Sequence, residues 1–547
     1  MYKKIKITNI IIYLVVLLFC VVVIFLLGWG KKQQLMQSKK NIETIYVGGI
    51  VNHHLLARDI IEKFFMVSSK FNYDKIVILS PDHFNSCSLY SSAFLTTDNA
   101  YWAISQEHGI QNLLPFVQKT WPNAVVVPLI VCPKAVALPL DILESPNTFI
   151  IASVDFSHYL PKHLMELHDN KSIDNIVYFE NLNNIDVDCP LCIKFLRDMA
   201  VKKGATNILE IGRGNSFDYS QSKNPRTGTS YFSAIFSKEK TDTSNFYNIN
   251  QTFLFVGDIM LARGVGDQID KYGFDYLLDN IKEAFRGVDY VVGNLEGPIV
   301  ENAPKVLHGS FSFAFSKESV NFLKKYRFNI LSLANNHTNN YKGESGFVQT
   351  LDFLKSVGIN SVGHYKDCSN KYIYNNNNDY FISFNLTFGD NGCSQEIIKN
   401  IQNIKQTDNQ SFVILMPHWG TEYKTHSNSV QQKLAHQFID AGADLIVGTH
   451  PHVVQEIELY KNKIIFYSLG NFIFDQWFSI NTQQGLMVGY DGLYYYLIPV
   501  ESEKSALSFM DSDKSKVFLQ DLAKRSDLEL TKMIENGKID IDNLTNP

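Results

Sequence analysis

Between residues 252 and 472 the chain alternates short apolar runs with longer mixed segments, and each run ends in polar residues. The runs have the length of buried strands, and mixed segments such as 319–326 and 429–442 have the pattern of helices. This alternation is typical of an α/β fold with a mostly parallel sheet, in which sites gather at the carboxyl ends of strands. The expected strands are 252–258, 289–296, 328–337, 411–420, 443–450 and 463–472.

The first half of the chain repeats this alternation, with apolar runs at 75–80, 124–131, 148–159 and 229–237. A chain of 547 residues is also too long for one compact core, so we expect more than one domain. The predicted organisation is a membrane anchor over 1–30, an α/β domain over 44–237, a polar linker over 238–250, a second α/β domain over 251–500 and a charged tail over 501–547.

Residues 9–30 carry no charge and are long enough, as a helix, to cross a bilayer core of about 30 Å. They predict an uncleaved transmembrane signal anchor, because no small-x-small cleavage site follows the apolar stretch. A cleaved signal peptide is one alternative. A lipoprotein attached through Cys20 is another, although bulky Phe19 precedes it. The expected localisation is therefore a single-pass protein of the cell membrane.

Composition excludes some functions. The formal net charge of -5 provides no broad basic surface, so nucleic acid is not an expected partner. The seven cysteines are scattered, and only Cys189 and Cys192 are close in sequence. No disulfide framework is predicted from this spacing.

The strand ends of the second half carry residues of the same chemical kind. Carboxylates, asparagine amides and imidazoles together suit Mn, Fe or Zn, and two such ions about 3.5 to 4 Å apart would support hydrolysis. Two of the imidazoles, His450 and His452, are two positions apart, so on an extended strand they would face the same side. The full set of strand-end residues is Asp258, Asn294, Glu296, Asn335, Asn336, His337, His418, His450 and His452.

The motifs that contain these residues are, in order, VGDIMLARG, GNLEGPI, SLANNHT, HWGTEY, GTHPHVVQ and YSLGNFIFDQ. They resemble the CapA family of capsule or poly-γ-glutamate synthesis proteins, which is similar in fold to the calcineurin-like metallophosphoesterases. The resemblance implies that Glu296 bridges two metals and that His337 and Asn335 are catalytic. It further implies one metal held by Asp258 and His452, and another held by Asn336, His418 and His450.

Two positions depart from the patterns that the resemblance implies. Met260 lies where metallophosphoesterases carry a histidine two residues after the first aspartate, which leaves one metal with fewer ligands and makes a single-metal site an alternative. Asn340 replaces an aspartate after the NNHT motif, so that position has lost its negative charge.

A second group of polar strand ends lies in the first half of the chain and could form a mononuclear metal site, a thiol activated by histidines, or ordinary packing. The order of its motifs is similar to the Memo family (AmmeMemoRadiSam system protein B-like), whose fold resembles the non-haem iron class III extradiol dioxygenases. That resemblance implies iron or copper bound by His53, His83 and Cys189, with Asp155 and His158 lining the pocket.

The leading hypothesis is a membrane-anchored, metal-dependent hydrolase of the CapA type, acting outside the cytoplasmic membrane in capsule, poly-γ-glutamate or envelope polymer metabolism. Its expected partners are the membrane, an anionic polymer or phosphoester substrate, and polymer-synthesis proteins. Two alternatives remain open. The first is a non-catalytic accessory protein with structural metals, and the second is an iron- or copper-dependent redox enzyme acting through the Memo-like half.

Overall fold

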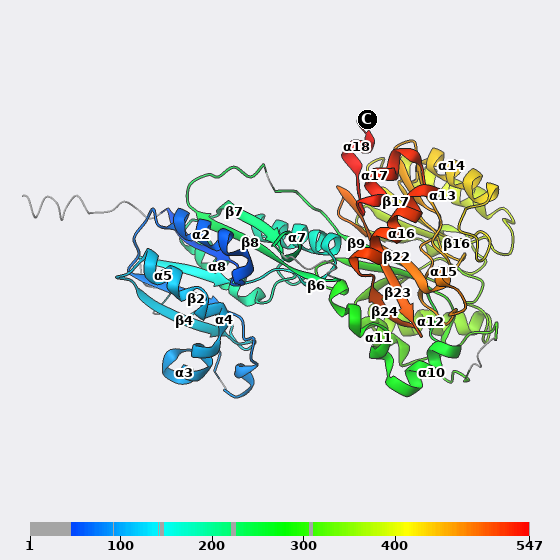
Figure 1. Cartoon of the computed structure of the whole chain (residues 1–547). Helices are drawn as coiled ribbons and strands as arrows, with labels where there is room; N and C mark the ends of the chain where they lie inside the picture. Colours follow the sequence, from blue (N-terminus) through cyan, green and yellow to red (C-terminus); the bar gives the residue numbers. More distant parts are fainter. Residues whose placement is uncertain are drawn as a thin grey trace, which may run out of the picture.

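A computed structural model describes residues 45–545, except 91, 140–141, 143–146, 220–225, 245 and 306–309. These residues form two lobes (Figure 1). The first lobe is built from β1 to β8 and the second from β9 to β25, with helix α7 lying where the two lobes meet.

Within the described ranges, the first lobe is built on an eight-stranded sheet with the order β3-β4-β2-β5-β1-β8-β6 and with β7 paired to β8. Strands β4, β2, β5 and β1 are parallel, and β3, β8, β6 and β7 add antiparallel pairs. Parallel strands that are buried on both faces need nearly continuous apolar sequence, which these runs supply. The strands are β1 (Tyr46–Val51), β2 (Lys75–Ser80), β3 (Phe94–Leu95), β4 (Val125–Val131), β5 (Thr148–Ser153), β6 (His158–Leu160), β7 (Asn207–Asn215) and β8 (Gly228–Ser237).

Helices cover both faces of this sheet and form two apolar cores with it. The helices of the first lobe are α2 (Arg58–Ser68), α3 (Thr97–Gln106), α4 (His108–Gln111), α5 (Leu114–Thr120), α7 (Lys162–Val177), α8 (Pro190–Lys202) and α9 (Ser216–Tyr219).

The second lobe contains two larger mixed sheets in the described part of the chain. One has nine strands in the order β14-β13-β10-β9-β22-β23-β24, with β21 paired to β9 and β25 to β23. The other has six strands in the order β15-β16-β17-β18-β20-β19. Apolar residues of both sheets share one core, while helices pack on the outer face of each sheet. The lobe is therefore a sandwich of two sheets between helical layers.

The elements of the second lobe follow in chain order. Its strands are β9 (Phe253–Ile259), β10 (Tyr290–Leu295), β11 (Ile299–Val300), β12 (Phe315–Ser316), β13 (Phe328–Ser332), β14 (Asn360–Val362), β15 (Tyr374–Asn376), β16 (Asp379–Asn385), β17 (Phe412–His418), β18 (Leu445–Val447), β19 (Ile457–Tyr460), β20 (Lys463–Phe466), β21 (Asn471–Ile473), β22 (Gln484–Tyr490), β23 (Tyr494–Glu503), β24 (Ala506–Phe509) and β25 (Lys538–Asp540). Its α-helices are α10 (Arg263–Tyr272), α11 (Ser319–Lys325), α12 (Glu344–Ser356), α13 (Cys393–Thr407), α14 (Ser429–Ala441), α15 (Ile480–Gln483), α16 (Ser512–Arg525), α17 (Thr531–Glu535) and α18 (Ile541–Thr545).

The sequence predicts a charged tail over 501–547, of which the structure describes residues 501–545, and these contribute to the fold of the second lobe. Strands β24 and β25 pair with β23, and the helices between them bury Phe518, Leu522 and Ile534 in the core that the two sheets share. These helices are amphipathic: charged residues lie on the outer face and apolar residues on the face that packs against the core. The charged residues dominate the sequence pattern, so the apolar face was not recognised from the sequence.

Cysteine pairing differs from the sequence-based expectation. Three disulfides are present among the described residues: Cys87–Cys132, Cys189–Cys192 and Cys368–Cys393. Two of them join segments 45 and 25 residues apart in the sequence, so spacing alone gave no signal of the pairing.

The expected fold class must be corrected with respect to its transmembrane helix. The longest described helix, α7, has 16 residues, whereas crossing a bilayer takes about 20. No helix within the described ranges is long and apolar enough to cross a membrane. The segment 9–30, on which the expectation rested, lies outside the described residues. What the structure describes is mixed α/β with several sheets, and the expected single-pass membrane localisation is contradicted by the same finding.

Helix α7 joins the two lobes. Its Leu164, Met165 and Leu167 belong to the core of the second lobe. At the edge of this contact, Lys538 Nζ of β25 lies 3.2 Å from a carboxylate oxygen of Glu166, which is also 3.4 Å from His163 Nδ1. Burial would raise the pKa of Glu166, but the partners His163 and Lys538 outweigh it and lower the pKa to about 2.

We predict that Glu166→Gln lowers the free energy of unfolding by roughly 1 to 2 kcal/mol at pH 7, because it removes a half-buried charge pair. A carboxyl group with a depressed pKa stabilises the fold above its ordinary pKa, and this contribution is lost as pH falls toward about 2. Urea unfolding should therefore show the difference between variant and parent at pH 7 and little difference near pH 2. Glu301→Gln, which breaks the exposed pair with Lys317, is the control and should change stability far less. An equal effect of both substitutions would contradict the prediction.

Candidate metal centre

Two carboxylates lie together at the ends of adjacent strands. Asp258 is in β9, and Glu296 directly follows β10, which runs parallel to β9. Both side chains are fully buried. Asp258 accepts hydrogen bonds from Asn294 Nδ2 at 2.7 Å and from the backbone N–H of His450 at 3.2 Å. The parallel register therefore places both acids at one edge of the sheet.

Glu296 is the least satisfied of these groups. Neither of its carboxylate oxygens has a hydrogen-bond partner among the described residues. Burial, followed by the charge of Asp258, raises the pKa of Glu296 well above its usual range. A buried carboxylate with no donor is costly to the fold, and a bound cation would remove that cost.

His450 and His452 follow β18 and approach these acids from the second sheet. They do not continue an extended strand as the sequence predicted, because both residues adopt positive φ, 97° and 58°. Backbone in this region is strained for residues other than glycine and is often found at functional sites. The two turns direct His452 Nδ1 to 3.4 Å from Asp258 and its Nε2 to 3.9 Å from Glu296. The two imidazoles therefore reach the same centre, but through turns rather than strand alternation.

Asn471 orients His452. Its Oδ1 lies 3.0 Å from His452 Nδ1, and strand pairing sets Asn471 opposite Asp258. Nδ1 of His450 is buried and has no partner in the described part of the chain, and burial lowers the pKa of His450 to about 4. His450 is therefore neutral at neutral pH, which is the form of histidine that binds metals.

His418, at the end of β17, is fully buried and interacts with predicted neighbours. Its Nε2 lies 2.8 Å from Asn336 Oδ1, and its Nδ1 lies 3.0 Å from Thr449 Oγ1. Burial, with the nearby imidazoles of His450 and His452, lowers the pKa of His418 well below its usual range. The structure thus brings Asn336 and His418 into direct contact beside His450, whose ring centre is 4.8 Å from that of His418.

His337 is held by Asn340, the residue that replaces an aspartate. Nδ1 of His337 is 2.7 Å from Asn340 Oδ1, which also accepts the backbone N–H of Phe313 at 3.0 Å. Because that N–H can only donate, the atom it meets is the amide oxygen, so His337 carries its hydrogen on Nδ1. His337 Nε2, 3.7 Å from Glu296, is then free to accept a proton. Burial lowers the pKa of His337 to about 4, although the bond to Asn340 opposes this change.

Asn335 is buried, and both the nitrogen and the oxygen of its side-chain amide form hydrogen bonds. Its amide donates to Asn294 Oδ1 and to the backbone carbonyl of Leu295, while its Oδ1 accepts from the N–H of His337 and from Thr338 Oγ1. These bonds place Asn335 behind the strand ends, where it positions His337.

The candidate ligand atoms fall into two adjacent groups that share His452. Those of Asp258, Glu296 and His452 lie within 4.8 Å of one another, as do those of Glu422, His450 and His452. Sequence reasoning missed Glu422, although it lies within the quoted HWGTEY motif, because it follows the strand by four residues and is exposed. The donor set of carboxylates and neutral imidazoles, with the orphaned oxygens of Glu296, fits a divalent transition metal.

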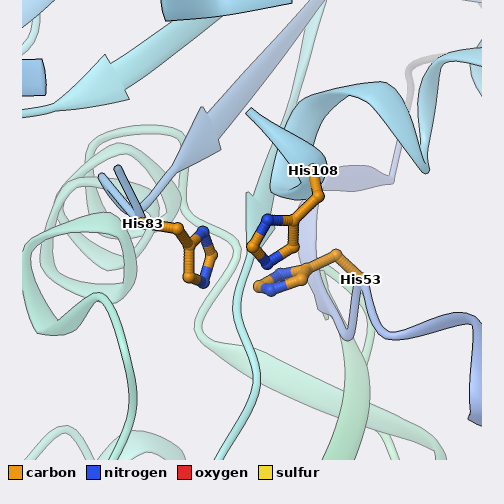
Figure 2. A group of neighbouring side chains, drawn as sticks. All are labelled: His53, His83 and His108. Atoms are coloured by element: carbon orange, nitrogen blue, oxygen red, sulfur yellow. The ribbon is translucent and has the colours of Figure 1, made fainter. Parts of the chain in front are cut away.

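The predicted site of the first lobe is only partly assembled as expected. His53 and His83 lie together with His108, which sequence reasoning missed (Figure 2). Asp155 and Asp188 lie beside His53. Burial lowers the pKa of His53 to about 4. Burial would also lower that of His83, but the carboxylates of Asp188 and Glu107 raise it to about 9.

Two residues predicted for this site have other positions. Cys189 is bonded to Cys192, so the expected thiol or thiolate ligand must be corrected to a disulfide. The CxxC spacing was the signal for this pairing. His158 begins β6 and belongs to neither group of candidate ligands.

Comparisons with known proteins agree with these lobes. Residues 252–387 and 369–476 match the family described as bacterial capsule synthesis protein PGA_cap. The PGA biosynthesis protein CapA of Bacillus subtilis is 33% identical over 317 residues, which are 53% of this chain and 81% of that relative. The chain therefore belongs to the CapA family.

Two weaker similarities are a relative that matches the N-terminal region and one solved structure. A MEMO1 family protein of Pyrobaculum aerophilum is 23% identical over 163 residues, which are 27% of this chain and 57% of the relative, and the match lies in the N-terminal region. Among solved structures, purple acid phosphatase PPD1 from yellow lupin seeds has a TM-score of 0.27 and 11% identity, covering 51% of this chain and 61% of that one. That likeness is too slight to support an argument.

We predict that Glu296→Gln stabilises the metal-free protein by roughly 1 to 3 kcal/mol at pH 8, because it replaces an orphaned buried carboxylate with a neutral group. The same variant should lose the rise in Tm that Mn²⁺ or Zn²⁺ gives the parent. Thermal melts with and without chelator measure both effects. Glu456→Gln is the matched control. Glu456 is also buried but accepts bonds from Ser427, so its substitution should destabilise the protein. Destabilisation of the metal-free protein by Glu296→Gln would contradict the assignment.

Proposed function

We propose that the second lobe is a metal-dependent hydrolase that acts on an anionic polymer or phosphoester in capsule or poly-γ-glutamate metabolism. The observation that carries this proposal is Glu296, whose two buried oxygens have no hydrogen-bond partner among the described residues and whose Oε1 lies 3.7 Å from His337 and 3.9 Å from His452. Support for the substrate class comes from family membership and from the CapA relative, which is described as a PGA biosynthesis protein.

The residues that would hold the metal are Asp258, Glu296 and His452, with His450 and Glu422 at an adjacent position. A divalent metal there would polarise the substrate oxygen and make water a better nucleophile near neutral pH. Asn471 and Asn294 fix the orientation of His452 and Asp258, so that these donors are arranged before any ligand binds.

His337 is the proton acceptor in this proposal. Its Nδ1 hydrogen is held by Asn340, so Nε2 presents a lone pair on the side of Glu296. Its low pKa keeps the ring neutral at neutral pH, so Nε2 starts in the form that can accept a proton from water and carries no proton to donate to a leaving group. Phe313 stacks on the ring at 4.0 Å between centres and limits its rotation.

Glu422 completes the second metal position. Met260 lies where related sites carry a histidine, and its buried side chain belongs to the apolar core of the second lobe, where its Sδ accepts the backbone N–H of Ala262 at 3.1 Å. The ligand atom of Glu422 lies within 4.8 Å of those of His450 and His452, so Glu422 would supply an oxygen ligand in place of that nitrogen.

Purified protein loaded with Mn²⁺, Fe²⁺ or Zn²⁺ should hydrolyse bis-p-nitrophenyl phosphate or the γ-glutamyl amide bonds of poly-γ-glutamate. We expect His450→Ala to lose the metal bound at this centre together with the activity. His337→Gln should keep the metal and lower kcat by about 100-fold or more, because only the proton acceptor is removed. His426→Ala, an exposed histidine outside the site, is the control. If loaded protein cleaves neither substrate and His337→Gln is without effect, a binding role in polymer synthesis replaces the hydrolase.

Glu422→Gln should lower the metal bound per chain by about one ion relative to the parent, because it removes the only carboxylate of the second group. Elemental analysis after equilibrium dialysis gives this ratio without relying on activity. Glu529→Gln, at an exposed position far along the chain, should leave the ratio unchanged. Equal metal content in the parent and in Glu422→Gln would show that the second position does not exist.

A further inference from the structure

A polar cavity lies where the two lobes meet, beside helix α7. Three stretches of the chain line it: the second half of α7 with the loop that follows, residues 248–250 of the segment between the lobes, and Asp289, which directly precedes β10 of the second lobe. The cavity has a volume of about 350 Å³. Its lining includes five asparagines, three carboxylates and one lysine. A cavity of this composition is suited to a ligand held by hydrogen bonds.

Asp174 of α7 is the group in this lining whose hydrogen bonds are incomplete. The residue is buried, with 3% of its surface exposed, and its carboxylate accepts the backbone N–H of Ile249. Its Oδ1 has no hydrogen-bond partner among the described residues. A buried carboxylate oxygen without a donor is unfavourable. A molecule in the cavity that donated a hydrogen to Oδ1 would remove that cost.

Lys171 lies one helical turn before Asp174 and supplies donors. Its Nζ is 3.3 Å from Oδ2 of Asp289, which also accepts hydrogen bonds from the N–H and the hydroxyl of Thr252. An ammonium group carries three hydrogens, so Lys171 can donate to a ligand while it stays paired with Asp289. The cavity therefore offers an acceptor and a donor that are neighbours on one face of α7.

Two of the asparagines add an acceptor and a donor. Asn175 Nδ2 donates to the carbonyl of Asn181 at 2.8 Å. Asn184 Oδ1 accepts from Arg327 Nη2 of the second lobe at 2.6 Å. Within the described residues these bonds use one end of each amide, so that Oδ1 of Asn175 and Nδ2 of Asn184 are available to a ligand.

Charge and size narrow the class of ligand. The carboxylates of Asp174, Glu180 and Asp289 disfavour an anion, and the ammonium group of Lys171 disfavours a divalent cation. A hydroxyl group both donates and accepts, so neighbouring hydroxyls of a neutral molecule match the acceptor and the donor on α7. The cavity volume is at the small end of the range for ligand sites, about 300 to 1,000 Å³. Tyr178, 41% exposed, offers an aromatic ring to the C–H groups of such a molecule.

We propose that this cavity binds a neutral, hydroxyl-rich molecule of the size of one sugar residue, with Asp174 accepting and Lys171 donating hydrogen bonds to neighbouring hydroxyls. The site is separate from the metal centre of the second lobe. Asp289 precedes β10 and Glu296 follows it, so a strand of six residues, about 20 Å, lies between them. Because both lobes contribute to the lining, the ligand would also hold α7 against the start of β10.

The experiment uses the full chain at pH 8 with EDTA, and its probes are D-glucose, D-galactose, D-mannose and N-acetyl-D-glucosamine. Burial raises the pKa of Asp174 to about 6, so its carboxylate is ionised at pH 8. We expect at least one of these sugars to give saturation-transfer-difference NMR signals and to raise Tm. The chelator keeps the metal centre empty, so the result does not depend on the proposed hydrolase. D-Glucuronate should bind more weakly than D-glucose, because its carboxylate meets three others.

Three variants make the outcome decisive. Asp174→Asn should raise the Tm of the sugar-free protein, because it removes a buried charge that lacks a donor, and should weaken sugar binding by about 10-fold or more. Higher stability together with weaker binding excludes misfolding as the cause. Tyr178→Ala changes an exposed side chain and should weaken binding as well. Asp198→Asn, at an exposed position of α8, is the control and should bind as the parent does.

The proposal fails if none of the four sugars binds to the parent protein. It also fails if a sugar binds to the parent and to Asp174→Asn with equal affinity, since that result would place the sugar elsewhere.

Discussion

The burial of Asp258 and Glu296 side by side is the constraint on which the second lobe depends. Two acidic groups without access to water are unfavourable, and within the described part of the chain Asp258 has hydrogen-bond donors whereas Glu296 has none. Asn294, Asn335, Asn471 and the strained turn at His450 form a shell of amides and neutral imidazoles around them. A bound cation would neutralise the two buried carboxylates. The unfavourable free energy of burying them would then be offset by the free energy of cation binding.

Each lobe carries a group of metal-competent side chains, and the two groups differ in composition. In both, metal-competent side chains follow the carboxyl ends of neighbouring parallel strands, where a sheet leaves space for a site. The second lobe uses carboxylates as its central donors, whereas the first uses mostly imidazoles, with Asp188 beside them. Carboxylate oxygens are harder ligands than imidazole nitrogens, so the two groups of side chains suit different metal ions. Helix α7 packs into the core of the second lobe, which joins the two lobes mechanically.

Sequence patterns predicted the strands well because a parallel strand buried on both faces needs an apolar run that few other structures require. The run at 75–80 coincides with β2, and 411–420 contains β17. Patterns were less informative where long-range contacts decide the structure. Strands β24 and β25 complete the sheet from a region that is charged on one face, and Cys87 pairs with a cysteine 45 residues away. The transmembrane prediction for 9–30 was a local inference from hydropathy, and the described helices give it no support.

The sequence by itself determined which residue types stand at the strand ends, because strand polarity and apolar periodicity are local properties. The resemblance of its motifs to the CapA family implied that Asp258, Glu296 and His452 serve one metal. Only the tertiary structure decided that Glu422 lies with the histidines, that His108 and Asp188 lie with His53, and that Cys189 is closed in a disulfide. Those contacts join loops and helix ends that are distant in sequence, and their distances follow from the packing of whole elements rather than from any local pattern.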